Sequence, residues 1–212
     1  MMTIHYFTFG PVAENTYLIW DETKECVIID PGNSNPSENK ILSDFIAKHE
    51  LKLVRLLLTH GHFDHINGNK YIFDTYGLLP EIHPTEVLFI EHHVSSALKY
   101  GYQPEQSPMP KNLLNEGDII HFGNSALEIV FTPGHSPGHI TFYSTKERFM
   151  VSGDVLFYSS IGRTDLYMSN HQDLIDSIKN KLYPLGDDMT VYAGHGEPTN
   201  LGDERQYNMF LQ

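Results

Sequence analysis

The stretch THGHFDH, residues 59–65, directly follows three consecutive leucines and places three histidines and one aspartate within six positions. The leucines read as the end of a strand that is buried on both faces. In an extended chain, His60, His62 and Asp64 would project from one side, because successive side chains alternate. His65 breaks this alternation and requires the chain to turn, which a following helix would provide. We therefore expect two donor sets that point in slightly different directions.

Imidazole and carboxylate donors without a thiolate suit zinc, iron or manganese in a reactive site, whereas structural zinc sites are usually rich in cysteine. The chain holds a single cysteine, Cys26, inside an apolar run, where a buried structural role is expected. With thirteen histidines in the chain, some will be close in sequence by chance. Even so, this density of donors after a buried strand favours a metal site over isolated surface or core histidines.

Composition and charge limit the functions that are open to the chain. With 212 residues, of which 40% are hydrophobic and 19% charged, the sequence is that of a folded protein, and we expect one domain over residues 1–212. The net charge of -13 and the lack of a basic run argue against nucleic acid or an anionic membrane as a partner. No stretch has the length of a transmembrane segment and no signal sequence is visible, so a cytoplasmic location is expected. The oligomeric state is left open.

The coarse element order predicts a layered fold. A strand meander is followed by a helix and a buried strand, then by helices, and the same mixture is repeated. Such an order suits two sheets that are packed together with helices outside. The expected strands are 4–9, 16–20, 26–29, 51–58, 118–121, 126–131, 140–144, 149–152 and 190–193, and the expected helices are 37–50, 66–76, 84–100 and 172–182.

Further metal donors stand at apparent strand ends in the second half of the chain. TPGHSPGH, residues 132–139, contains His135 and His139, and SGD ends in Asp154. GHG places His195 between two glycines. Small neighbours allow a backbone to come close to an ion.

Together with Asp30-Pro31-Gly32, these motifs follow the order found in metallo-β-lactamase-fold hydrolases, and the chain most resembles the glyoxalase II (hydroxyacylglutathione hydrolase) branch. The resemblance covers almost the whole chain. Each motif alone is weak, but five in the family's order are specific. The resemblance implies an α+β fold, an αββα four-layer sandwich with metals at one edge between the sheets.

The same resemblance implies two divalent metal ions, most simply zinc, with iron or manganese as alternatives. Asp30 matches a position near the metals where a carboxylate could orient a ligand histidine. His139 matches a nearby position that is not a ligand, and an orienting role and a structural role both stay open. The implied ligands are His60, His62 and His135 for one metal and Asp64, His65 and His195 for the other, with Asp154 bridging both.

The implied reaction is hydrolysis of a small-molecule thioester by a hydroxide shared between the two metals. Asp64 and Asp154 are the expected catalytic carboxylates, and Asp64 would hold the proton of the nucleophile; a helix-capping role for Asp64 is the alternative. Arg163, in a loop after Asp154, resembles a basic residue that contacts the glycine carboxylate of glutathione. In the alternative reading, Arg163 pairs with Asp165 to fix the loop.

The chain departs from full-length glyoxalase II enzymes, which carry a further helical C-terminal region, because it ends about ten residues after Gly202. Hydrolysis is therefore better supported than glutathione recognition. The same motifs occur in persulfide dioxygenases, where His60, His135 and Asp154 would bind a single iron. Those enzymes have cysteine and glycine where this chain has Ser160-Ile161. A non-enzymatic metal-binding or scaffold protein is the third reading.

Overall fold

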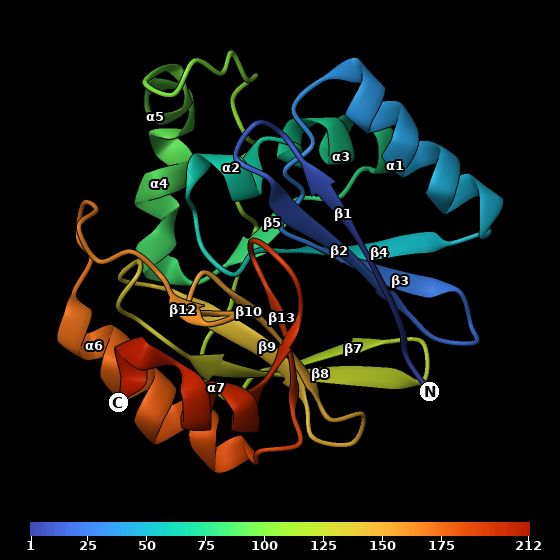
Figure 1. Cartoon of the computed structure of the whole chain (residues 1–212). Helices are drawn as coiled ribbons and strands as arrows, with labels where there is room; N and C mark the ends of the chain where they lie inside the picture. Colours follow the sequence, from blue (N-terminus) through green and yellow to red (C-terminus); the bar gives the residue numbers. More distant parts are fainter.

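Two six-stranded sheets lie face to face in the computed structural model, which describes residues 1–212, and helices cover both outer faces (Figure 1). The first sheet is ordered β1-β2-β3-β4-β5-β6 and the second β14-β13-β10-β9-β8-β7. This is the αββα sandwich expected from the sequence. The strands are β1 (Thr3–Phe9), β2 (Glu14–Trp20), β3 (Glu25–Ile29), β4 (Lys52–Leu57), β5 (Pro80–Ile82), β6 (Asn112–Leu113), β7 (Ile119–Phe122), β8 (Ser125–Phe131), β9 (Ile140–Ser144), β10 (Phe149–Gly153), β13 (Thr190–Ala193) and β14 (Thr199–Asn200), and a small separate hairpin is formed by β11 (Leu156–Phe157) and β12 (Ser160–Ile161).

The helices divide between the two outer faces (Figure 1). The N-terminal and central helices cover the first sheet, and the C-terminal helices cover the second. Those on the first sheet are α1 (Pro36–Lys48), α2 (Phe63–Ile66), α3 (Asn69–Tyr76), the 3-10 turn η1 (Pro84–Glu86), α4 (Val87–Glu91) and α5 (His93–Leu98). Those on the second are α6 (His171–Asp176), the π-helical turn η2 (Ser177–Leu182), the 3-10 turn η3 (Tyr183–Leu185), α7 (Leu201–Tyr207) and the 3-10 turn η4 (Met209–Leu211).

Three buried apolar clusters explain the four layers. The middle cluster lies between the sheets and joins residues such as Ile29 and Leu57 from one sheet to Phe142 and Val151 from the other. The second cluster lies between the first sheet and its helices. The third packs α6, η2 and α7 against the outer face of the second sheet. Each sheet is therefore covered on both faces, which accounts for its nearly continuous apolar strands.

The helix after the histidine motif begins earlier than predicted. The sequence pattern predicts one helix over 66–76, whereas α2 already starts at Phe63 and α3 follows after a break at Gly68. The break has a packing cause, because the Gly68 N–H donates to the Pro31 carbonyl and a Cβ at Gly68 would lie 2.0 Å from Asn33 Oδ1. The single helix predicted over 84–100 is likewise divided, into η1, α4 and α5.

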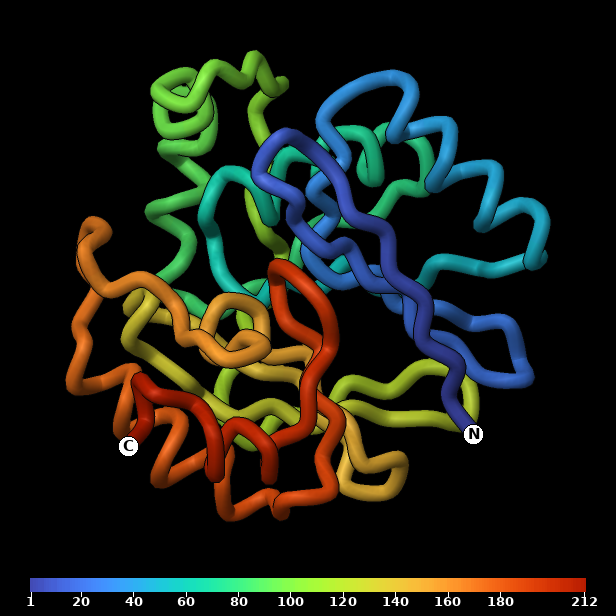
Figure 2. Tube along the Cα trace, in the orientation of Figure 1, coloured from blue at the N-terminus to red at the C-terminus, as the bar shows by residue number.

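One edge of the sandwich brings the ends of both sheets together. At the end of β4, the Thr59 carbonyl accepts the Ile140 N–H at 2.9 Å, which ties the histidine motif to the start of β9. The loop after β13 reaches the turn between β1 and β2 (Figure 2) and the start of β2, where the Asn15 N–H donates to the Gly194 carbonyl. Loops from opposite sheets are therefore held side by side at this edge.

Asp21, directly after β2, ties the first sheet to the β7–β8 turn of the second. Its carboxylate accepts hydrogen bonds from Thr23 and from the Asn124 N–H and the Ser125 hydroxyl. Burial alone would raise the pKa of Asp21, but these donors lower it to about 2. The ionised form is therefore the one that the fold stabilises.

We predict that Asp21→Asn lowers the free energy of unfolding at pH 7 by about 2 kcal/mol, because hydrogen bonds to a charged acceptor are lost. The pKa is lower in the folded state, so this stabilisation is fully present above the unfolded value of 3.8 and is lost as the pH falls toward about 2. Urea unfolding of both proteins across this pH range measures the difference. Asp203→Asn, at an exposed site, is the control, and a difference that persists unchanged at low pH would contradict the charge-based explanation.

Candidate metal centre

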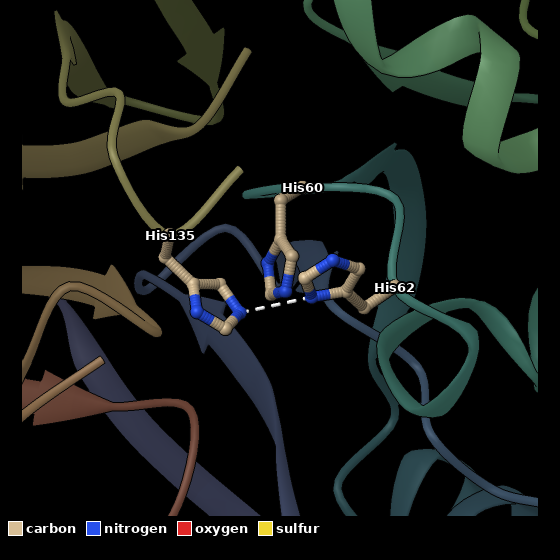
Figure 3. A group of neighbouring side chains, drawn as sticks. All are labelled: His60, His62 and His135. Atoms are coloured by element: carbon tan, nitrogen blue, oxygen red, sulfur yellow. Dashed lines mark hydrogen bonds between the residues drawn. The ribbon is translucent and has the colours of Figure 1, made fainter. Parts of the chain in front are cut away.

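Three histidine rings converge where the loop after β4 meets the loop between β8 and β9 (Figure 3). They belong to His60, His62 and His135, and one nitrogen from each lies within 4.8 Å of the other two. His62 Nδ1 and His135 Nε2 are 2.9 Å apart. We call this group the three-histidine set.

In two of these rings, those of His60 and His135, the Nδ1 atom contacts an oxygen of a neighbouring residue. His60 Nδ1 lies 3.0 Å from Thr59 Oγ1, and His135 Nδ1 lies 2.9 Å from the Arg163 carbonyl oxygen, to which it can donate. His60 and His135 are thereby oriented so that Nε2 faces the centre, whereas His62 faces His135 through Nδ1. His60 Nε2 is buried and has no hydrogen-bond partner, which is uncommon for a buried polar atom unless an ion or ligand binds there.

A second set, Asp64, His65 and His195, lies beside the first. His65 Nδ1 is 3.0 Å from Asp30 Oδ2, and His195 Nδ1 is 3.1 Å from the carbonyl oxygens of Val12 and Ala13. The free Nε2 atoms therefore face inward. His195 Nε2 lies 3.3 Å from Asp64 Oδ2.

The start of α2 determines which set Asp64 joins. The pattern from an extended chain groups Asp64 with His60 and His62, but Asp64 lies in the first turn of α2 and meets His65 and His195 instead. The capping alternative receives no support, because no side chain forms a hydrogen bond at the N-terminus of α2.

Asp154, directly after β10, stands between the two sets. Its carboxylate oxygens lie 3.3 Å from His135 Nε2, 3.4 Å from His65 Nε2 and 3.6 Å from His195 Nε2. Oδ1 is buried without a hydrogen-bond partner. Asp154 thus lies against histidines of both sets, the position that a bridging carboxylate would require.

The two sets differ in charge. Burial lowers the pKa of His60, to well below the usual histidine value, and that of His62 to about 3, so these rings are neutral. Burial opposes the charge on His65 as well, but the neighbouring Asp154 and Asp64 outweigh it and raise the pKa of His65. Burial likewise opposes ionisation of Asp154, and the surrounding histidines nevertheless lower its pKa.

This charge pattern suits cations. Neutral imidazoles and ionised carboxylates are the protonation states that metals require. In the second set, the proton on His65 lies where positive charge is favoured, so that binding of a cation there would release it.

Asp30 connects the two sets. Its oxygens accept hydrogen bonds from the Thr59 N–H at 2.7 Å and the Thr59 hydroxyl at 2.6 Å, besides the contact with His65. Through Thr59 it also orients His60. The residue has a positive φ of 50°, which directs its carboxylate back into the site.

Both ring nitrogens of His139 contact other protein atoms. Its Nε2 accepts the Asp154 N–H at 3.1 Å, which leaves the proton on Nδ1, 3.2 Å from the Thr132 hydroxyl. Burial lowers its pKa and keeps it neutral. His139 therefore positions the backbone of Asp154 and has no nitrogen free for a metal.

Two buried glutamates near the site, Glu14 and Glu86, are not predicted from the sequence. Glu14 lies 3.9 Å from His65 Nδ1 and has one unpartnered oxygen, and burial raises its pKa well above the usual value. Glu86, in η1, accepts the N–H groups of Gly61 and Gly138. In the sequence each is a single acidic residue at the start of a strand or helix, where an exposed position is the ordinary expectation.

Arg163 lies in the loop after β12, close to the three-histidine set through its backbone. Its guanidinium donates to both oxygens of Asp165 at 2.9 Å, and both side chains are exposed, by 64% and 70%. The pairing expected in the alternative reading is thus present.

Comparison with known proteins identifies the family. A family model described as the metallo-β-lactamase superfamily matches residues 9–195. The chain belongs to the metallo-β-lactamase superfamily. It is 36% identical to hydroxyacylglutathione hydrolase GloC of Haemophilus influenzae, over 99% of this chain and 98% of that protein, which supports the glyoxalase II-like branch.

Solved structures of the superfamily share the fold closely. The crystal structure of BLEG-1 B3 metallo-β-lactamase has a TM-score of 0.90 and 35% identity, covering 99% of this chain and all of that chain (100%). TTHA1623, crystallised in a di-iron-bound form, has a TM-score of 0.88 and 35% identity over 98% and 100% of the two chains. No helix of the present chain combines the length and apolar character needed to cross a bilayer.

The site fits the divalent metals that this superfamily implies. His60 Nε2, His65 Nε2 and Asp154 Oδ1 are buried atoms that form no hydrogen bond with the protein, although the last two lie 3.4 Å apart. A cation is the simplest group that satisfies them together. Membership and donors together identify the chain as a metal-binding hydrolase of this superfamily.

We predict that Asp30→Asn weakens zinc binding by about 10- to 100-fold, the usual effect of removing an outer partner of ligand histidines. Asparagine tolerates a positive φ, so the backbone is preserved and the loss reports on the carboxylate. Competition with a chromophoric chelator measures the affinity. Asp44→Asn, on the exposed face of α1, should bind as the unaltered protein does; equal affinity of Asp30→Asn would refute the role given to Asp30.

Proposed function

We propose that the protein is a metal-dependent thioesterase of the glyoxalase II type, which cleaves S-(2-hydroxyacyl)glutathione-like thioesters. The observation that carries the proposal is the sharing of Asp154 between two complete donor sets. Two adjacent divalent ions, when bound, polarise a carbonyl and supply an ionised water near neutral pH. We propose zinc first, while a di-iron-bound relative keeps iron as an alternative. The proposed ligands are His60, His62 and His135 for one ion and Asp64, His65 and His195 for the other, with Asp154 between them.

In this proposal, Asp64 holds the proton of the attacking water. Burial opposes its ionisation, but His65 and His195 lower the pKa of Asp64, so its carboxylate is available as an acceptor. Its Oδ2 faces the centre, 3.3 Å from His195 Nε2. Asp154 would have the complementary task of holding the two ions at a fixed separation.

Arg163 would bind the carboxylate of the thiol part of the substrate. The ion pair with Asp165 is compatible with this role, because an exposed ion pair contributes little stability. The guanidinium can therefore leave Asp165 and bind a substrate carboxylate. The Arg163 backbone carbonyl meanwhile fixes the His135 ring. Backbone and side chain of one residue would thus link the metal site to the substrate.

Length does not argue against glutathione recognition. The Haemophilus influenzae protein is named a hydroxyacylglutathione hydrolase, and this chain covers 98% of it. A relative with that name, matched over nearly its whole length, supports a glutathione thioester as the substrate.

A persulfide dioxygenase is the second candidate function. His135 Nε2 and Asp154 Oδ2, two of the three ligands that a single iron would use, are 3.3 Å apart. His60 would supply the third. The two candidates differ in their substrates and in their need for oxygen, so one assay series separates them.

We predict that the zinc-loaded protein hydrolyses S-D-lactoylglutathione and that Asp64→Ala lowers kcat by at least about 100-fold, because the proton acceptor and a ligand are lost together. Thioester absorbance follows the reaction, and Asp44→Ala serves as the control. Lack of hydrolysis with zinc and with iron bound would refute the thioesterase. Oxygen consumption with glutathione persulfide in the iron-loaded protein would then support the dioxygenase.

We further predict that Arg163→Ala raises KM about tenfold with little change in kcat, as expected when a uniform binding contact is removed. Asp165→Ala frees the guanidinium and should leave KM unchanged or lower it. If Arg163 only fixed the loop, both substitutions would break the same ion pair and impair the enzyme alike. Steady-state kinetics on the same thioester distinguish these results.

A further inference from the structure

The two loops that carry the three-histidine set are joined by one buried side chain that is not a metal donor. Glu86 ends the short turn η1, and its side chain is 0% exposed. Its Oε2 accepts the Gly61 N–H at 2.8 Å and its Oε1 accepts the Gly138 N–H at 2.6 Å. One carboxylate thus binds the backbone of both loops.

The positions of the two glycines show which residues the hydrogen bonds of Glu86 position. Gly61 lies between His60 and His62, and Gly138 lies between His135 and His139 in the other loop. His139 in turn accepts the Asp154 N–H. Glu86 therefore fixes the separation of the loops from which all three imidazoles of the three-histidine set project, and its second hydrogen bond lies next to the residue that positions Asp154.

Close packing supports the same conclusion independently. A Cβ added at Gly61 would lie 2.7 Å from Phe89 Cβ, and one added at Gly138 would lie 2.5 Å from Thr85 Oγ1 and 2.8 Å from Glu86 Cγ. Both loops thus lie directly on the segment 85–89. Only glycine allows this approach, so the segment acts as a support for the two loops at once.

The second donor set has other supports. His65 is oriented by Asp30, and His195 by the carbonyls of Val12 and Ala13. Glu86 forms no hydrogen bond with Asp30, Val12 or Ala13, the residues that orient His65 and His195. The influence of Glu86 should consequently be greatest on the three-histidine set.

We propose that Glu86 is a positioning residue that selectively sets the geometry, and hence the metal affinity, of the three-histidine set. The inference rests on the proposed metal site, but not on the identity of the substrate. Hydrogen bonds that orient metal-binding groups are typically worth 10- to 100-fold in metal affinity. Loss of Glu86 should therefore weaken one site by that factor and spare the other.

Glu86→Gln is the informative change, because glutamine has nearly the same shape but only one acceptor oxygen. Its NH2 group would face one of the two glycine N–H groups, so one loop is released. Glu91→Gln, at the exposed end of α4 five residues later, is the matched control. It alters the same charge without a hydrogen bond to either loop.

Zinc titration calorimetry in two backgrounds tests the selectivity. In His195→Ala, which leaves the three-histidine set, Glu86→Gln should weaken binding about 10- to 100-fold. In His135→Ala, which leaves the second set, it should change affinity by less than about threefold. Unchanged affinity in the first background, or equal loss in both, would overturn the proposal, whereas zinc binding without thioester hydrolysis would count only against the proposed function.

Amide exchange provides a second readout, which starts from the unaltered protein. In the metal-free protein, the Gly61 and Gly138 amide protons should exchange slowly, since both are buried against Glu86, and both should exchange faster in Glu86→Asp, whose shorter carboxylate cannot span the two loops. Rapid exchange of either amide in the unaltered protein would overturn the proposal. Unchanged exchange in Glu86→Asp would do so as well.

Discussion

The carboxylate of Asp30 is the constraint on which the centre depends. It holds Thr59, two residues after the end of β4, by the N–H and hydroxyl of that residue, and it orients His65 six residues further along. The chain is thereby fixed at both ends of the histidine motif. Because Thr59 also contacts His60, a single buried carboxylate determines the direction of one imidazole in each donor set.

Around this anchor the protein separates donors from supports. Residues that face the centre leave one atom free, while Asp30, Glu86 and His139 use their hydrogen-bonding atoms within the protein. Their burial is tolerable because these bonds compensate for the lost hydration. The unpartnered atoms of His60, His65 and Asp154 lie together, where a bound cation would compensate for them.

Sequence reasoning recovers much of this arrangement, and its failures have physical causes. The layered fold and the donor motifs are visible because apolar strands and clustered histidines are local patterns. The start of α2 lies before the predicted start because Phe63 and Asp64 belong to the histidine motif, whose alternating donors predict an extended chain. Short strands such as β5 and β6 carry too few residues for any period. Glu14 and Glu86 were missed because burial of an isolated glutamate depends on contacts that are distant in sequence.

The spread of the donors along the chain affects how metal can be acquired during synthesis. His135 lies more than seventy positions after His62, and His195 is still further away. A growing chain that has made only the first sheet offers His60 and His62 of one set and Asp64 and His65 of the other, so neither set is complete. His135 and His195 complete the two sets only after the second sheet has docked.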